Sequence, residues 1–477
     1  MTTFSRDTAD NIRHRLSEVT GQEIRKDTVN TIHGVCYGLL GGKGYGELIE
    51  SKDIEDFNKA TGYKIAFSNG EFTDNPGSSL IECISWLANT GTPLSKIVEY
   101  PGWRDVKMSP QRAIEAIKTY KDWKQENSKL DFTDMLQQVK NDSLVPDVDV
   151  LMVDEFQDLT TLQHDIFKMW AGEIKHVIIA GDPMQAIYDF WGADPKYFNS
   201  FDGEKITLPK SHRLSSAIWQ YAKAITKTCG ISSPVIETGT HPGIIRRVIH
   251  REYMNMRDVW EGGPGKPVFH LVRSNYQAPA ITHLLAESGI LWTGINGWSL
   301  HDIEATNAII SARAGNALKP SEILTLSEHY PNELFNGGKT RTATQDKIKS
   351  LNVPQFPGGE GMVSDKLYDI LLSKNPVSYM SRAGELKTAK INNALARFNR
   401  RISPEDINTS ILTIHASKGL EASRVFLHTG ITTNLQKAAR RGNSEARVFY
   451  VGVTRAIDEL YLVKDTGYNF SLPAVVA

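Results

Sequence analysis

Two adjacent carboxylates follow a short apolar run in this 477-residue chain. The run is VLMV, residues 150–153, and it leads directly into Asp154 and Glu155. In α/β proteins that hydrolyse a nucleotide, an Asp at the end of a strand holds magnesium and a neighbouring Glu activates the attacking water. Asp154 fits the first role and Glu155 fits the second. The alternative is an ordinary acidic helix N-terminus, which the helix dipole favours.

A second polar segment follows the next apolar run, and its sequence is GDPMQAIYDFWGA, residues 181–193. Gln185 is placed to reach a terminal phosphate or the water that attacks it. Tyr188, Phe190 and Trp191 form an aromatic cluster on which the bases of a single strand could stack, each base contributing about 1–3 kcal/mol. The alternative is that these aromatic side chains belong to the core.

The elements around these segments predict a parallel sheet. The apolar runs VDVLMVDEF and HVIIAGD flank TTLQHDIFKMWAG, which has helical period, and strand–helix–strand order is typical of α/β folds. PVFHLVRSN and APAITHLLAESG repeat the strand–helix order near residue 268. Towards the C-terminus, SILTIHASKGLEASRVFLHTG and ARVFYVGVTRAIDELYLV are interpreted as strand–turn–helix. We therefore expect two α/β cores, each interrupted by a mainly helical and polar insertion.

Composition limits the kind of protein this is. The formal net charge is -1, so any surface that binds nucleic acid must be a local groove of Lys and Arg. The three cysteines, Cys36, Cys83 and Cys229, have no partner pattern and are interpreted as reduced thiols. No apolar run approaches the roughly 20 residues that span a bilayer, and the N-terminus lacks the apolar stretch of a signal peptide. We expect a cytoplasmic protein that does not associate with a membrane.

Several segments occur in the order seen in the UvrD/Rep family of superfamily 1 DNA helicases, and the chain resembles that family. The strongest matches are VDEFQD, AGDPMQAIYDFWGA, LPKSHRLSSAI, LTIHASKGLE and FYVGVTRA; TTFSRDTADNIRHRL, TIHGVCYGLL and LDFTDMLQQV resemble three further family segments. The resemblance implies an α/β fold of two RecA-like motor domains with parallel sheets. It also implies ATP and Mg²⁺ as cofactors, with ATP between the domains and single-stranded DNA across them.

The resemblance also divides the chain. The first motor domain is expected at residues 1–40 and 130–208, with an insertion at 41–129. The second is expected at 209–300 and 405–477, with an insertion at 301–404. By resemblance the activity is ATP-dependent 3′ to 5′ movement on single-stranded DNA or single/double-strand junctions. The second insertion is short for the family, which leaves strand separation open.

Residue roles follow from the same resemblance. Asp154 would be the magnesium ligand, Glu155 the catalytic base and Gln185 the residue that couples nucleotide to DNA. Arg213 and Arg455 would reach the γ-phosphate. Two further nucleotide contacts are Glu421, at the ribose, and His212, which stands where the family usually stacks a tyrosine on adenine. The expected DNA contacts are Phe4, Thr31, His33, Tyr188, Phe190, Arg273, Asn275, His415 and Ser417.

The family's phosphate loop, of the form GxxxxGK followed by Ser or Thr, is expected to be missing from this sequence, because the chain begins inside the segment that normally follows it. Two displaced candidates are rejected. ELFNGGKT has Glu333 where the first Gly belongs, and GGKGYG lacks a Ser or Thr after Lys43. Three explanations stand: a longer N-terminus, a second polypeptide that carries the loop, or lost catalysis. Retention of Glu155, Gln185 and both arginines argues against lost catalysis.

Two functions of different classes are therefore expected. The leading hypothesis is an ATP-dependent DNA helicase or translocase that needs a missing or separately encoded phosphate-loop segment. The rival is a non-catalytic single-strand-binding or accessory protein, which would bind DNA in a salt-sensitive way that is indifferent to ATP. A nuclease fusion is disfavoured, because no further acidic cluster follows residue 460.

Overall fold

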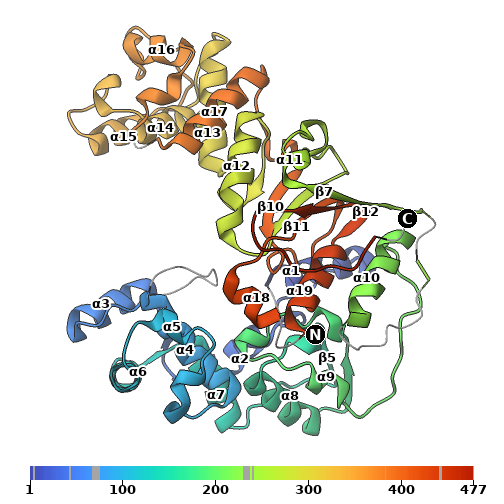
Figure 1. Cartoon of the computed structure of the whole chain (residues 1–477). Helices are drawn as coiled ribbons and strands as arrows, with labels where there is room; N and C mark the ends of the chain where they lie inside the picture. The colour runs from blue at the N-terminus through green and yellow to red at the C-terminus, as the bar shows by residue number, and fades with distance from the viewer. Residues whose placement is uncertain are drawn as a thin grey trace. The chain divides into compact units, whose positions relative to one another are not determined.

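The computed structural model describes residues 1–3, 6–41, 44–66, 76–228, 237–238, 241–381, 383–439 and 443–475. The chain divides into two compact units, Met1–Ile206 and Thr207–Ala477 (Figure 1). Each unit contains its own parallel sheet, as the sequence predicted. Phe4 and Cys229, two residues singled out from the sequence, lie outside the described residues.

The sheet of the first unit has the order β2-β1-β5-β6 and is parallel throughout. Its strands are β1 (Thr2–Thr3), β2 (Asn30–Thr31), β5 (Val150–Val153) and β6 (His176–Ile179). Leu151 and Val153 point into a core that is completed by the helices α2 (Ile32–Leu40), α7 (Phe132–Asn141) and α8 (Thr161–Glu173). The two strands and the helix predicted between residues 148 and 182 are confirmed. Helix α1 (Arg6–Thr20) is followed by Gly21 with φ +66°, a left-handed conformation that commonly ends a helix.

The first unit contains a helical insertion that begins after β3 (Glu47–Leu48) and ends at β4 (Lys129–Leu130). These two strands pair with each other. Buried Lys124 forms ion pairs with Asp131 and Asp134, where α7 begins. Asp131 also caps α7 by accepting hydrogen bonds from the Thr133 and Asp134 amides. The segment LDFTDMLQQV therefore anchors the insertion to the unit. The insertion contains α3 (Ser51–Thr61), α4 (Pro76–Thr90), η1 (Leu94–Glu99), α5 (Trp103–Val106) and α6 (Pro110–Glu126).

The sheet of the second unit has the order β7-β12-β11-β8-β10-β9 and is also parallel. Its central strand β8 is VFHLV, and all five of its residues are buried. Apolar runs of this kind are typical of parallel strands that are covered on both faces. The strands are β7 (Ile244–Ile249), β8 (Val268–Val272), β9 (Thr293–Gly294), β10 (Thr409–Thr413), β11 (Ala422–His428) and β12 (Ala456–Lys464).

The strand–turn–helix interpretation is wrong for residues 410–430, which form the strands β10 and β11 with a turn between them. It is also wrong for residues 446–463. This segment is the helix α19 (Ser444–Val453) followed by the strand β12. The run VFYVGV is buried on all sides of its helix, so its apolar residues show no helical stripe, and its β-branched and aromatic content favours a strand. Two other helices of this unit are α10 (Ser216–Thr228) and α12 (Ala278–Glu287).

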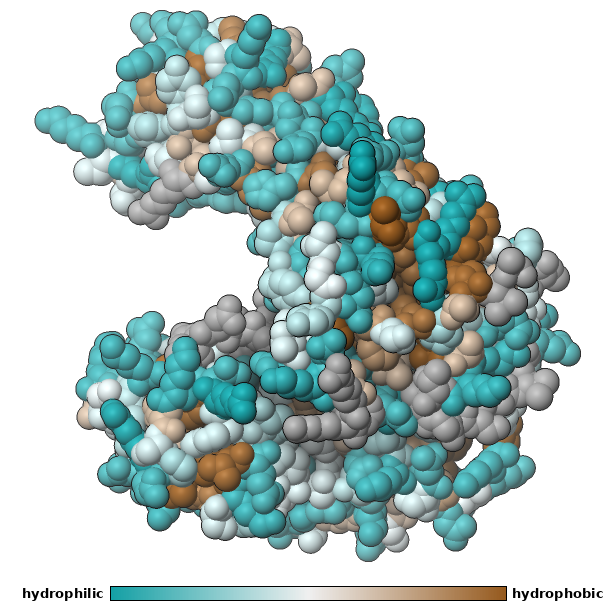
Figure 2. Space-filling view, viewed as in Figure 1, coloured by the Kyte–Doolittle hydropathy of each residue, from teal (hydrophilic) through white to brown (hydrophobic). Residues whose placement is uncertain are grey.

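The second insertion is helical and ends before β10. Its helices are α13 (Leu300–Arg313), α14 (Pro320–His329), α15 (Arg341–Lys349), α16 (Asp365–Leu372) and α17 (Glu385–Arg397). Figure 2 shows a mostly hydrophilic surface over this segment in the drawn view. In the rejected loop ELFNGGKT, the Thr340 hydroxyl caps α15 by accepting a hydrogen bond from the Ala343 amide. Phe335 of this loop forms an isolated antiparallel bridge with Val363 and is not part of a strand. In the described part of the chain, no helix has the length and apolar character needed to cross a membrane.

Candidate functional site

The acidic pair lies at the carboxyl end of β5. The Asp154 amide donates to the carbonyl of Thr2 on the neighbouring strand at 2.9 Å, and the Asp154 carboxylate accepts from the Glu155 amide at 2.9 Å. Glu155 has φ 55° and ψ 39°, a left-handed conformation that is uncommon for a residue other than glycine. Backbone strain of this kind clusters at functional sites. Both carboxylates are half-buried, so the turn presents them without enclosing them.

Gln157, which the sequence analysis did not single out, holds this pair in place. Its side chain is fully buried in η2 (Phe156–Asp158). Its Nε2 donates to the Glu155 carboxylate, and its Oε1 accepts from the Asp182 amide at 3.0 Å. Gln157 therefore ties the candidate base to the loop that follows β6. The only signal in the sequence was its position two residues after the glutamate.

Gly181 is required for this bridge. A Cβ atom at Gly181 would lie 2.1 Å from Oε1 of Gln157 and 3.2 Å from the amide nitrogen of Phe156. The first distance is far below any real contact, and the atom that it meets is held by hydrogen bonds. A side chain at this position would have to displace Gln157 from Glu155 or from Asp182.

Gly181→Ala is expected to open the bridge. The Asp182 amide would lose its acceptor, and such losses cost about 1–3 kcal/mol. Exchange of the Asp182 amide hydrogen, followed by NMR, should then be about tenfold faster or more. Gly172→Ala in α8 is the matched control, since a Cβ atom there meets nothing within 4 Å. Equal effects of the two substitutions would contradict this account of Gly181.

Gln185 closes the same network. It ends η3 (Pro183–Gln185), and its Nε2 donates to the Asp182 carboxylate at 3.0 Å. Asp182 in turn accepts from the Met184 amide at 2.9 Å. The structure therefore brings the predicted base and the predicted coupling glutamine into one hydrogen-bonded chain, Glu155–Gln157–Asp182–Gln185. We call these four hydrogen-bonded residues the acidic network.

This site fits Mg²⁺ as an ion that one protein carboxylate shares with substrate phosphates and water. No group of three or more His, Cys, Asp or Glu side chains in the described ranges could hold a metal ion by itself. Mg²⁺, however, is usually held by one or two carboxylates together with substrate phosphates and water. Asp154, half-buried at the strand end, fits the part of the single protein carboxylate.

The predicted stacking pair lies beside the acidic network. The ring centroids of Tyr188 and Phe190 are 6.1 Å apart at 55°, and both side chains are half-buried. Burial and the carboxylates of Asp158 and Glu155 raise the pKa of the Tyr188 hydroxyl well above its ordinary value. The Tyr188 hydroxyl therefore lies within electrostatic reach of the candidate base.

Two other predicted DNA contacts of the first unit have structural tasks. The Thr31 hydroxyl is buried and caps α2 by accepting from the Gly34 amide at 3.1 Å. Burial, and then the charge of Arg6, lowers the pKa of His33 to about 4. His33 is therefore neutral at physiological pH, and its ring contacts that of Phe132 edge to face at 6.1 Å. Neither side chain offers a positive charge to a phosphate.

The nucleotide candidates of the second unit lie together although they are far apart in sequence. Arg213 forms an ion pair with Glu421, 208 positions later, and both side chains are partly exposed. Arg455 is buried, and it donates to the carbonyl oxygens of Leu420 and Val451, each at 3.1 Å. Arg213 is paired with a partly exposed carboxylate, whereas Arg455 is enclosed and is held by backbone acceptors. His212 is exposed beside Arg213.

The remaining DNA candidates lie on two adjacent loops, after β8 and after β10. The Ile414 amide donates to the Val272 carbonyl and joins these loops. Arg273 makes two hydrogen bonds to Glu445, at 2.8 and 2.7 Å, so its guanidinium is already engaged. The Ser417 hydroxyl is fully buried and donates to the Ile414 carbonyl at 2.8 Å. Asn275 is exposed and His415 is half-buried. Of the four candidates, these two are the more accessible to a DNA strand.

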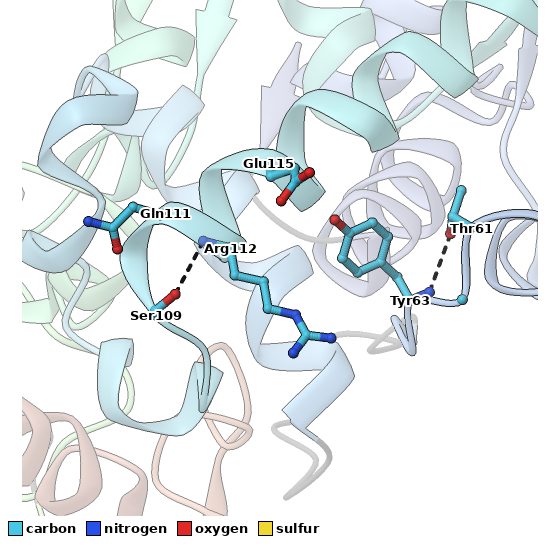
Figure 3. A pocket seen from close by; sticks show the side chains of 7 residues that line it. Thr61, Tyr63, Ser109, Gln111, Arg112 and Glu115 are labelled. Atoms are coloured by element: carbon cyan, nitrogen blue, oxygen red, sulfur yellow. Dashed lines mark hydrogen bonds between the residues drawn. The ribbon is translucent and has the colours of Figure 1, made fainter.

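A pocket of about 460 Å³ lies in the first insertion, between the end of α3 and the start of α6 (Figure 3). Its wall is polar and includes Tyr63, Arg112 and Glu115. It contains none of the residues predicted to contact nucleotide or DNA, so it is separate from the acidic network.

The chain is similar in sequence to known helicases. Residues 1–205 match the UvrD/REP helicase N-terminal domain, and residues 366–466 match the UvrD-like helicase C-terminal domain. A probable DNA helicase II homolog of Mycoplasma pneumoniae is 21% identical over 97% of this chain and 76% of its own length. The putative ATP-dependent DNA helicase YjcD of Bacillus subtilis is 22% identical over 97% and 72%. The ATP-dependent DNA helicase UvrD2 of Mycobacterium tuberculosis is 22% identical, and the match spans 69% of this chain but only 50% of that relative.

Proposed function

The chain belongs with the UvrD-like helicases, whose N-terminal and C-terminal domains it carries, and we propose that it is an ATP-driven motor that moves 3′ to 5′ on single-stranded DNA. The observation that carries this proposal is the acidic network. It links a strained glutamate at the end of one parallel strand to a glutamine beyond the next strand, 30 residues later in the chain. Such a link lets the state of the nucleotide reach the aromatic pair that follows Gln185.

Glu155 acts as the general base. Its carboxylate takes the proton of the attacking water, and the hydrogen bond from Gln157 fixes its orientation. Bound ATP with Mg²⁺ supplies the phosphoanhydride bond that is cleaved and the charge that polarises it, with Asp154 as the protein's ligand to the metal. Because Gln157 also holds the Asp182 amide, a shift of the loop after β6 changes the position of the base.

Arg213 and Arg455 stabilise the charge that develops on the phosphate. A guanidinium forms two parallel hydrogen bonds to a phosphoryl group, which Lys cannot do. Arg213 is available because its present partner, Glu421, is a partly exposed carboxylate. On the DNA side, Tyr188 and Phe190 offer ring faces to bases, and this contact tolerates any sequence. Asn275 and His415 add contacts from the second unit.

We propose that the cradle for the β- and γ-phosphates comes from a segment outside the described residues. A loop of this kind follows a parallel strand and opens a helix, so that backbone amides and the helix dipole face the phosphates. Among the described residues, no glycine-rich loop follows a strand of either sheet and leads into a helix in this way. The same observation favours the rival function, a DNA-binding accessory protein that does not turn over ATP.

Single-strand binding with and without nucleotide separates the two functions. A labelled oligonucleotide is titrated by fluorescence anisotropy at several salt concentrations, with and without a non-hydrolysable ATP analogue. A motor is expected to change its DNA affinity about 5-fold or more when the analogue binds, because coupled sites typically differ by 1–3 kcal/mol. Binding that is salt-sensitive but stays indifferent to the analogue when a segment that supplies the phosphate cradle is present would support the accessory protein and contradict the motor.

A further inference from the structure

The turn that follows β8 presents two side chains to solvent. It consists of Arg273, Ser274 and the short helix η6 (Asn275–Gln277). Asn275 is exposed, and Tyr276 beside it is 58% exposed. The sequence analysis named Asn275 as a DNA contact but did not single out Tyr276. An exposed aromatic ring next to a predicted DNA contact is suited to stack on a base of a single strand.

Both ends of this turn are fixed. At its start, Arg273 makes two hydrogen bonds to Glu445, whose side chain is only 5% exposed. At its end, Oε1 of Gln277 accepts hydrogen bonds from the Arg273 and Ser274 amides, each at 3.0 Å. Gln277 therefore closes the turn. The direction in which the two exposed side chains point depends on where Gln277 is held.

Asp465, which follows β12, holds Gln277. Its Oδ2 accepts hydrogen bonds from Nε2 of Gln277 at 3.3 Å and from the Gly430 amide at 2.9 Å. Its Oδ1 lies 2.8 Å from Nδ1 of His428, a buried residue at the end of β11. Burial raises the pKa of Asp465, but the hydrogen bond and the charge of His428 lower it by more, so the pKa lies below its ordinary value. One carboxylate thus joins the turn after β8 to the ends of β11 and β12.

Gly430 allows this link to form. A Cβ atom at Gly430 would lie 2.8 Å from Oδ2 of Asp465 and 2.8 Å from Nε2 of Gln277. These are the two atoms that the hydrogen bond joins, and real Cβ atoms essentially never lie within 3.0 Å of another heavy atom. A side chain at Gly430 would therefore push Gln277 away from Asp465 and move η6.

We infer that η6 is a contact for single-stranded DNA in which the ring of Tyr276 stacks on a base, and that Asp465, acting through Gln277, is its positioning residue. This inference rests on the proposed function only in taking a single strand as the ligand. The hydrogen bonds order the turn before the strand binds, so less conformational entropy is lost on binding. Because every base has an aromatic face, the contact tolerates any sequence.

Stacking is tested on the full chain by fluorescence anisotropy with a labelled oligothymidylate in the absence of nucleotide. Tyr276→Ala is expected to weaken binding about 5- to 150-fold, which corresponds to the 1–3 kcal/mol of one base–aromatic stack. Tyr276→Phe keeps the ring and should recover most of this loss. Tyr379→Ala is the matched control, because Tyr379 is a tyrosine of the same unit that is 54% exposed.

Positioning is tested with Gly430→Ala, which separates Gln277 from Asp465. Gly263→Ala is its control, since a Cβ atom at Gly263 meets nothing within 4 Å. Gly430→Ala is expected to weaken binding about threefold or more, and to have little further effect when Tyr276 is already Ala, because both changes act through one contact. Gln277→Ala removes the same link without adding volume and should behave in the same way. Circular dichroism during thermal unfolding checks that each variant is folded.

The outcomes separate this inference from the proposed function. Equal binding by the Tyr276→Ala and Tyr379→Ala variants would overturn the inference alone. A loss in Tyr276→Phe equal to that in Tyr276→Ala would overturn the stacking. If Gly430→Ala and Gln277→Ala weaken binding equally with and without the Tyr276 ring, Asp465 is not a positioning residue for this contact. An unchanged protein that does not bind the oligonucleotide would contradict the proposed function together with the inference.

Discussion

Glu155→Gln is expected to lower single-strand-stimulated ATP turnover by about 10²–10⁴-fold, the usual contribution of a general base. The amide cannot accept the proton of the attacking water, yet it keeps the size of the carboxylate and so preserves the turn at φ 55°. DNA binding should stay within about twofold, because no charge that faces DNA is removed. Turnover is measured by phosphate release, in whichever form of the protein hydrolyses ATP, alone or with a segment that supplies the phosphate cradle.

The control for this variant is Glu173→Gln at the end of α8, an exposed glutamate of the same unit. It should change neither turnover nor DNA binding. If Glu155→Gln retains turnover within about tenfold of the unchanged protein, the assignment of the base is wrong. If both variants lose turnover equally, the loss reflects general damage to the unit.

Arg213→Ala is expected to lower turnover by about 10³–10⁵-fold, the range found for arginines that reach a transferring phosphoryl group. Its ion pair with Glu421 is partly exposed, so removing it should cost only about 0–1 kcal/mol of folding stability. Circular dichroism during thermal unfolding checks that the second unit remains folded, and phosphate release gives the turnover.

Arg251→Ala is the matched control, because Arg251 is an exposed arginine of the same unit. This control should keep full turnover. An Arg213→Ala protein that is folded and fully active would remove Arg213 from the phosphate site and leave its pair with Glu421 as a surface contact.

The acidic pair could be predicted from the sequence because its position depends only on local pattern. An apolar run of strand length ended in two carboxylates, and the structure places both at the end of β5. The partners of the other candidate residues could not be predicted, because they come from distant parts of the chain. Gln157 meets Asp182 across two strands, and Arg273 meets Glu445, 172 positions away. No local pattern indicates such a partner.

The buried state of Arg455 has the same cause. Its acceptor on Leu420 lies 35 positions earlier, and it is brought close by the pairing of β11 with β12. The resemblance implied only that Arg455 would reach the γ-phosphate, and the register of these strands shows that its side chain is enclosed.

The sequence pattern and the structure differ on one face of the first unit's sheet. VLMV and HVII are continuous apolar runs of the kind found in strands covered on both faces. In the structure the two faces differ, because Val150, Met152 and Ile178 are 39%, 40% and 52% exposed, whereas Leu151 and Val153 are each 3% exposed.

The central claim is that this chain is an ATP-driven motor on single-stranded DNA, and the most direct measurement is phosphate release with and without single-stranded DNA, with Glu155→Gln as the blank. The account predicts DNA-stimulated release above the blank when a segment that supplies the phosphate cradle is present, and release close to the blank when it is absent. Release indistinguishable from the blank with this segment present and DNA bound would contradict the motor. It would leave a protein that binds single strands without using ATP.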